Sequence, residues 1–184
     1  FEELVHRYEK WARLQIEWEQ MRDETIRNLK FPFSYREGQF NLAASVYRTI
    51  ARKKKLFIQA PTGTGKTMAV LYPAVRAMGE GLGEKIFYLT ARTITRTVAE
   101  QAFFILKEKG LKFRSVTLTA KEKICFCEKA ECNPQACPYA KGHFDRVNDA
   151  VYDLLKNGGG MGRKEIEEQA EKFQVCPFEF ALDL

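Results

Sequence analysis

A glycine-rich loop, APTGTGKT at residues 60–67, contains the residue types that bind a phosphate group. Backbone N–H groups of such a loop can wrap a phosphate, and the N-terminus of a following helix adds partial positive charge. Lys66 would reach the β- and γ-phosphates, and the Thr67 hydroxyl would bind Mg²⁺. The loop therefore predicts a nucleotide site of the Walker A type, with Ala60 in place of the usual first glycine. Its predicted nucleotide-binding residues are Pro61, Thr62, Gly63, Thr64, Gly65, Lys66 and Thr67.

A second candidate for nucleotide binding lies upstream of the loop, in the segment YREGQ at residues 35–39. The side-chain amide of Gln39 can pair with N6 and N7 of adenine at the same time. Arg36 belongs to the same segment and is predicted to contact the nucleotide with it. Nearby aromatic residues could shelter the base, although packing in a core is the commoner role for such side chains; they are Phe31, Phe33 and Tyr35.

The chain has five cysteines, all in its last third: Cys125, Cys127, Cys132, Cys137 and Cys176. Four of them share a polar loop with prolines, which argues against simple burial as small hydrophobic residues. Thiol clusters in intracellular chains usually bind zinc or an iron–sulfur cluster. The spacing does not choose between the two, although the paired CxxC motifs of a zinc ribbon are missing. A structural role without a metal also stays open.

Hydrophobic periodicity predicts the elements that position these residues. A long helix is expected at 2–29, ended by Pro32, and shorter helices at 37–53, 66–78, 95–109, 145–156 and 163–173. Short apolar runs predict buried strands at 56–60, 86–90 and 115–119. Strands that alternate with helices imply crossover connections and a parallel α/β sheet. The glycine run at 157–162 is expected to be a flexible tip.

Charge is distributed unevenly along the 184 residues. Residues 30–120 contain 16 Lys or Arg and 5 Asp or Glu, a net of +11, whereas the remainder has a net of −5. This block indicates an anionic partner, a nucleotide or a nucleic acid, although an ordinary solvated face would give the same count. The longest segments without a charged residue have ten residues, about half of the ~20 that a membrane-spanning helix needs, so no membrane partner is expected. The chain starts at Phe1 and is expected to be a piece of a longer protein.

Six segments, taken in order, resemble the XPD/DinG family of superfamily 2 iron–sulfur DNA helicases, with the bacterial DinG-like branch most similar. They are FPFSYREGQ (31–39), APTGTGKT (60–67), YLTART (88–93), LTAKEKIC (118–125), CPYAKGHFD (137–145) and VCPFEFALDL (175–184). The resemblance covers residues 31–184. It implies an α/β fold: the RecA-like parallel sheet of a P-loop NTPase, with an inserted small iron–sulfur domain and a long N-terminal helix. The implied domains are a linker helix at 1–30, the first part of motor domain 1 at 31–120 and the cluster domain at 121–184.

The resemblance also implies roles for single residues. The family's [4Fe–4S] ligands correspond by motif to four cysteines: Cys125, Cys132, Cys137 and Cys176. Cys127 is surplus and could replace Cys125. Lys121 occupies a basic position just before the first ligand, where the family places a cation near the cluster and DNA. YLTART resembles motif Ia, so Arg92 and Thr93 are candidate contacts to single-stranded DNA, although Arg92 could equally be a plain surface residue.

Carried over as a whole, the resemblance implies an ATP-dependent DNA helicase that moves 5′ to 3′ and serves DNA repair. Its cofactors would be ATP, Mg²⁺ and the [4Fe–4S] cluster, with Lys66 and Thr67 as catalytic residues. Its partner would be single-stranded or forked DNA, and it would act as a monomeric motor in the cytoplasm, associated with the nucleoid. No acidic pair follows an apolar strand, so the carboxylates of the family's DEAH box are missing. The chain by itself is therefore expected not to hydrolyse ATP.

Two alternatives stay open at this point. A small zinc-containing P-loop nucleoside kinase would explain the length, the loop and the cysteines, but not Gln39 or the cysteine spacing. A non-enzymatic interaction module, with the long N-terminal helix docked on a partner, is the other alternative.

Overall fold

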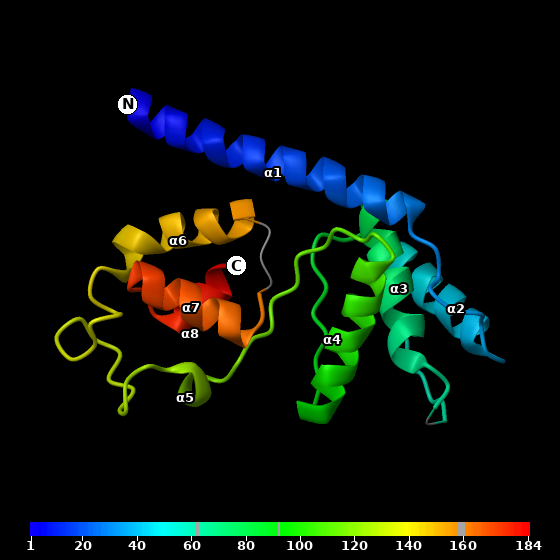
Figure 1. Cartoon of the computed structure of the whole chain (residues 1–184). Helices are drawn as coiled ribbons and strands as arrows, with labels where there is room; N and C mark the ends of the chain where they lie inside the picture. The colour runs from blue at the N-terminus through cyan, green and yellow to red at the C-terminus, as the bar shows by residue number, and fades with distance from the viewer. Residues whose placement is uncertain (62, 92, 158–160) are drawn as a thin grey trace. The chain divides into compact units, whose positions relative to one another are not determined.

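The computed structural model describes residues 1–61, 63–91, 93–157 and 161–184, and helices make up its regular secondary structure (Figure 1). In chain order these are α1 (Glu2–Asn28), α2 (Gln39–Ala51), α3 (Lys66–Gly79), α4 (Thr93–Glu108), α5 (Lys121–Ile124), α6 (His143–Asn157), α7 (Arg163–Phe173) and α8 (Pro177–Asp183). Within the described ranges, no helix combines the length and the apolar character that crossing a membrane would need.

The predicted helices are confirmed to within about two residues at each end. These helices could be predicted because each has a helical repeat of apolar residues and a glycine or proline beside it, and both signals are local in the sequence. The long helix α1 has Glu2 and Glu3 in its first turn and Arg27 in its last, which complements the helix dipole. Two short helices, α5 and α8, were not predicted, because four and seven residues are too few to show a repeat.

The predicted parallel sheet, and with it the RecA-like α/β fold, is wrong for the described part of the chain. The segments expected as strands contain no strand there, and a single-residue parallel bridge joins Val116 to Met161. Apolar side chains of two such segments lie in solvent: Phe57 is 94% exposed, Phe87 77% and Leu89 89%. A strand forms only when a neighbour pairs with its backbone and a core covers one face. A short apolar run specifies neither of these partners.

The described chain divides into two compact units. One, here called the cysteine unit, contains Phe1–Leu14 and Arg114–Leu184, and the other, the loop unit, contains Gln15–Phe113.

The core of the loop unit is built where the end of α1 meets α3 and α4. Its fully buried side chains include Ile26, Leu71 and Leu106. Gly79 allows the close approach of α1, because a Cβ at this position would lie 2.4 Å from Cγ2 of Ile26. The guanidinium of Arg76 donates hydrogen bonds to the carbonyl oxygens of Ile26 at 2.8 Å and Arg27 at 2.9 Å. These bonds satisfy the carbonyls at the end of α1 and fix α3, which carries the phosphate loop at its start.

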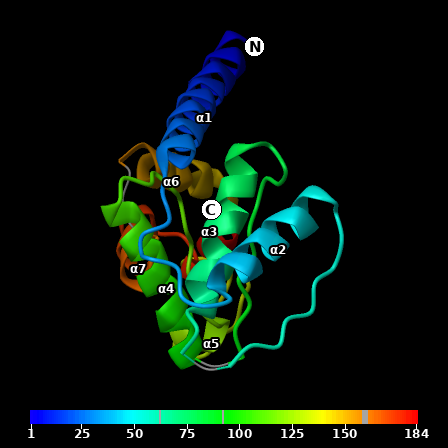
Figure 2. The same cartoon turned by 90° about the vertical axis from the view of Figure 1, so that its right-hand side faces the viewer.

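Helix α2 packs along α3 in the same unit, as both views show (Figures 1 and 2). Ala43 and Val46 of α2 are buried. This packing places the start of α2, and Gln39 with it, beside the loop that precedes α3.

The core of the cysteine unit is formed by α6, α7 and α8, with Ile166 and Phe180 fully buried. Trp11 of α1 packs edge-on against Tyr152, with ring centroids 5.2 Å apart. A polar contact also joins α6 to α7: the carboxylate of Asp153 accepts hydrogen bonds from Gln169 at 2.9 Å and Lys172 at 2.7 Å.

Candidate nucleotide site and cysteine cluster

The predicted phosphate loop ends directly at the N-terminus of α3. Gly63 and Gly65 adopt left-handed backbone conformations, with φ of 81° and 71°. Residues other than glycine rarely adopt such φ values, so these two positions require glycine. The first turn of α3 contains no acidic residue. The positive end of the helix dipole is therefore not neutralised locally, which suits an anion at this position.

The ammonium group of Lys66 lies over the start of its own loop. It donates hydrogen bonds to the carbonyl oxygens of Ala60 at 3.0 Å and Pro61 at 2.5 Å. The Thr64 hydroxyl donates to the Pro61 carbonyl at 3.0 Å. A lysine ammonium has three donors, so one remains for a phosphate oxygen while two hold the loop closed.

Gln39, the first residue of α2, is buried at 4% exposure and bonded to the loop. Its amide nitrogen donates to the carbonyl oxygen of Gly65 at 3.2 Å, and its amide oxygen accepts from the backbone N–H of Arg36 at 3.0 Å. The Arg36 guanidinium donates to the carbonyl oxygen of Gly63. Both residues predicted to bind nucleotide thus hold the backbone of the phosphate loop, and their contact with a nucleotide stays a prediction.

The aromatic residues before α2 form a chain of ring contacts. Phe31 stacks on Tyr35 with centroids 4.0 Å apart and meets Tyr72 of α3 edge-on at 5.3 Å. Burial raises the pKa of Tyr35, and the neighbouring Tyr72 adds to the effect. Phe33 is largely exposed. Phe31 therefore packs against α3, which agrees with the commoner role considered for it, whereas Tyr35 is 40% exposed and stacks on Phe31.

Some predicted contacts fall outside the described residues. Thr62 of the phosphate loop and Arg92 of the motif Ia segment lie there. Thr93 begins α4, but its side chain is not among those described.

The sulfur atoms of Cys127 and Cys137 lie 3.8 Å apart. The hydrogen bond between these two thiols raises the pKa of Cys127 to about 11, with smaller contributions from burial and from the charges of Cys137 and Cys125. Cys125 therefore lies beside the same pair. Cys132 is exposed and lies apart from it, with its sulfur 3.8 Å from the ammonium nitrogen of Lys121.

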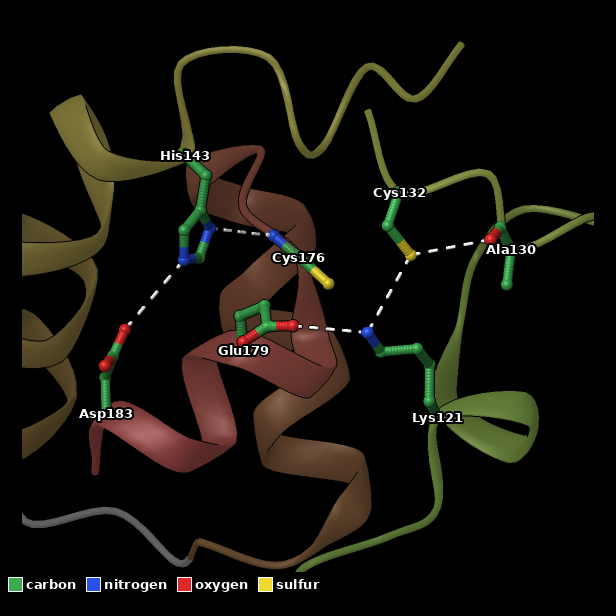
Figure 3. Close-up of polar contacts among 7 residues, drawn as sticks. All are labelled: Lys121, Ala130, Cys132, His143, Cys176, Glu179 and Asp183. Carbon is green, nitrogen blue, oxygen red and sulfur yellow. Dashed lines mark hydrogen bonds and ion pairs between the residues drawn. The ribbon is translucent and has the colours of Figure 1, made fainter. Parts of the chain in front are cut away.

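Lys121 joins α5 to the cysteine loop and to α8 (Figure 3). Its ammonium lies 3.3 Å from the carboxylate of Glu179 and 4.7 Å from the ring centre of Phe178. The hydrogen bond with Glu179 is the main reason why the pKa of Lys121 is raised. Figure 3 shows the Cys176 thiol directed toward the same region. The predicted cation thus neighbours two predicted ligands, and its contact with DNA stays a prediction.

His143 is a residue of this site that the sequence did not reveal. It is 4% exposed, and its Nδ1 accepts a hydrogen bond from the backbone N–H of Cys176 at 3.2 Å. Its Nε2 lies 3.9 Å from the Asp183 carboxylate (Figure 3). Burial lowers the pKa of His143, although the Asp183 and Glu179 charges oppose this. A lone histidine in the segment CPYAKGHFD gives no signal of such a bond.

The cysteines fit a metal cluster in kind and number, because thiolates are the ligands of iron–sulfur and structural zinc sites. Their placement does not show such a site. Over residues 1–61, 63–91, 93–157 and 161–184, no three His, Cys, Asp or Glu side chains gather closely enough to hold a metal ion. The sulfurs instead divide between the Cys127–Cys137 contact and the surroundings of Lys121.

The family comparison matches a segment that contains both the phosphate loop and the first three cysteines. The family profile described as DEAD/DEAH box helicase matches residues 41–133, half of the chain. A probable ATP-dependent helicase of Methanocaldococcus jannaschii, MJ0942, is 43% identical over 179 residues, with 77% of this chain and 28% of the relative covered. The chain thus spans about a quarter of that relative's length. No solved structure matches the chain. The matched region contains the loop of residues 60–67, so the chain belongs to the DEAD/DEAH box helicase family.

Proposed function

We propose that this chain supplies the ATP-binding loop of an ATP-dependent DNA helicase. The observation that carries the proposal is the glycine loop at the start of α3, where Gly63 and Gly65 have positive φ and Lys66 begins the helix. Backbone N–H groups in such a turn and an unneutralised helix N-terminus are suited to the β- and γ-phosphates of ATP. The match to DEAD/DEAH box helicases over this segment supports the same assignment.

Each residue of the loop has a proposed task. Lys66 would donate its third hydrogen bond to a phosphate oxygen while its two bonds to the loop carbonyls persist, and Thr67 would bind Mg²⁺ through its hydroxyl. Arg36 and Gln39 would keep Gly63 and Gly65 in the binding conformation, since their side chains bond those two carbonyls. Gln39 would also read adenine through its amide, which requires one of its present hydrogen bonds to be exchanged.

Single-stranded or forked DNA is the proposed partner, with movement in the 5′ to 3′ direction by a monomeric motor. The net charge of +11 over residues 30–120 supports a polyanionic partner. Arg92, Thr93 and Lys121 are the proposed contacts. Residues 31–120 would belong to the first motor domain and residues 121–184 to a cluster domain, with residues 1–30 as a linker.

We further propose that the cysteines hold an iron–sulfur cluster, as in the XPD/DinG branch. Its four ligands would be Cys125, Cys132, Cys137 and Cys176, with Cys127 as the alternative to Cys125. The support is the donor set, because the residues between Cys125 and Cys137 form no regular element and offer few apolar side chains. When bound, a cluster would order this loop through its iron–thiolate bonds.

Strand separation on tailed duplexes tests the helicase proposal. The complete protein is incubated with ATP and Mg²⁺ on duplexes that carry either a 5′ or a 3′ single-stranded tail. We expect strand separation on the 5′-tailed duplex, and none with a non-hydrolysable ATP analogue. Separation of the 3′-tailed duplex alone would reverse the proposed direction. ATP hydrolysis without separation of either duplex would contradict a DNA helicase.

A further inference from the structure

Cys127 has no role in the proposed four-ligand set, yet its thiol contacts the thiol of Cys137. Its sulfur lies 3.8 Å from that of Cys137, a contact within reach of a hydrogen bond between thiols. A disulfide has a sulfur–sulfur bond of about 2.05 Å. The two sulfurs therefore need to approach by less than about 2 Å for a bond to form.

Aromatic packing holds the two cysteine-bearing segments together. Phe126, next to Cys127, packs against Tyr139, two residues beyond Cys137, with ring centroids 4.9 Å apart. Phe126 also packs on the buried core of the cysteine unit. This ring contact lies at the base of the loop that separates the two cysteines, so the thiol pair is held near its contact distance by neighbours other than the thiols.

The loop between the two cysteines can adjust to a covalent bond. All residues from 128 to 136 are exposed, and none lies in a helix. The end of the loop is a turn, in which the backbone N–H of Cys137 donates to the carbonyl oxygen of Asn133 at 2.9 Å. The Asn133 side chain also accepts from the backbone N–H of Ala136 at 2.9 Å. The Cys137 side is therefore fixed, and the exposed remainder of the loop can absorb a small shift.

We propose that Cys127 and Cys137 are a redox pair that forms a reversible disulfide with hydrogen peroxide as the oxidant. The Cys137 thiolate attacks one peroxide oxygen, the O–O bond breaks, and a sulfenic acid and hydroxide result. The Cys127 sulfur then attacks the sulfenic sulfur, so that the S–S bond forms and the S–O bond breaks. The departing hydroxyl takes the Cys127 thiol proton and leaves as water. In total, two thiols and one peroxide give one disulfide and two waters.

Such a bond would have a regulatory consequence that rests on the proposed cluster. Cys137 is a proposed ligand, and a sulfur in a disulfide is no longer the thiolate that a metal needs. Oxidation of this pair and metal binding at Cys137 would therefore exclude each other. Disulfides in reducing compartments are usually labile and redox-sensing rather than structural, and the half-buried Cys127 and Cys137 flank a loop that is exposed.

Peptide mapping after oxidation tests the pair. The complete protein, freed of metal with a chelator and reduced, is treated with peroxide, and remaining thiols are blocked before trypsin digestion. Cleavage after Lys129 separates Cys127 from Cys137, so a peptide pair containing both survives only when linked. We expect this linked pair, lighter by about 2 Da than the sum of its reduced peptides, and its loss on treatment with dithiothreitol.

Serine variants identify the cysteines that are linked. Because the two peptides also contain Cys125 and Cys132, the matched controls are Cys125→Ser and Cys132→Ser, which should retain the link. Cys127→Ser should reduce the linked pair at least tenfold. A link that persists in Cys127→Ser, or disappears in Cys125→Ser, would overturn the assignment.

Iron loading separates this inference from the proposed cluster. Protein first reconstituted with iron and sulfide should give at least tenfold less linked peptide with the same peroxide, because Cys137 is engaged. If the protein binds no iron but forms the link, the proposed cluster is contradicted and the redox pair is supported. Iron-loaded protein that forms the link as fast as apoprotein would contradict mutual exclusion.

Discussion

The side-chain amide of Gln39 donates a hydrogen bond to the carbonyl oxygen of Gly65, with 3.2 Å between nitrogen and oxygen. The bond joins the first residue of α2 to the last glycine before α3. Gln39 is buried, and its amide oxygen also accepts from the backbone of Arg36, so the glutamine is fixed at both ends of its amide. The backbone of the phosphate loop is therefore bonded to a residue that lies outside the loop, 26 positions earlier in the chain.

Replacing Gly65 by alanine should damage this arrangement in two ways. The new Cβ would lie 2.3 Å from the Gln39 amide nitrogen, and φ of +71° is strained for alanine. We expect ATP affinity to fall at least tenfold and stability to fall by about 1–3 kcal/mol, measured by fluorescence titration and urea unfolding. The matched control is Gly81→Ala, which has a similar φ of +73° with nothing within 4 Å of the new Cβ. Equal ATP affinity in both variants would contradict the clash with Gln39.

The variant Gln39→Ala separates the two tasks proposed for this residue. Loss of the bond to Gly65 should weaken ATP and GTP binding alike, by roughly 3–30-fold, a cost typical of one or two buried hydrogen bonds. Loss of an adenine contact should weaken ATP binding further than GTP binding. Competition titrations with both nucleotides measure the two effects. An unchanged ratio of ATP to GTP affinity would contradict the proposed adenine contact. Unchanged affinity for both nucleotides would show that Gln39 does not contribute to the nucleotide site.

The carboxylate of Asp153 should make the cysteine unit less stable in acid. Hydrogen bonds from Gln169 and then Lys172 hold the pKa of Asp153 below its usual range. Stability from a lowered aspartate pKa is present above the unfolded-state pKa and is lost as pH falls through the folded one. We therefore expect Asp153→Asn to lower Tm near pH 7, and its Tm difference from wild type to shrink as the pH falls below about 4, the ordinary aspartate pKa. Asp149→Asn, an exposed change on the same helix α6, is the control. A Tm difference that stays constant with pH would show that the charge of Asp153 does not act through this contact.

The proposed cluster predicts colour and iron. Anaerobically purified complete protein should absorb broadly at about 400 nm and contain roughly four irons per chain. Serine at Cys132, Cys137 or Cys176 should remove both, whereas only one of Cys125→Ser and Cys127→Ser should do so. A colourless preparation with one zinc per chain would contradict the iron–sulfur assignment. Retained iron in Cys176→Ser would show that the ligand set is wrong.

Local patterns explain which parts of the structure could be predicted. The helices followed from apolar repeats and from their glycine and proline boundaries, and the phosphate loop from its glycines. The sheet prediction failed because strand pairing depends on distant partners, and the side chains of Phe57 and Phe87 are exposed instead. The bonds from Gln39 to Gly65 and from Cys176 to His143 were also missed. Both join residues more than 20 positions apart, and a single sequence gives no signal of such contacts.

The central claim is that residues 60–67 bind ATP for hydrolysis. Replacing Lys66 tests this claim most directly. ATP hydrolysis by the complete protein is measured with and without single-stranded DNA for wild type, Lys66→Ala and Lys85→Ala. Lys85 is exposed outside the loop, so its variant makes the same charge change as a control. We expect Lys66→Ala to lower the DNA-stimulated rate of ATP hydrolysis at least 100-fold, since one contact to transition-state charge contributes about 3–4 kcal/mol. Lys85→Ala should stay within about twofold of wild type, because exposed substitutions usually change energies by less than 0.5 kcal/mol. A Lys66→Ala rate within about threefold of wild type would contradict the assignment, because such a small loss is far below the cost of removing that contact.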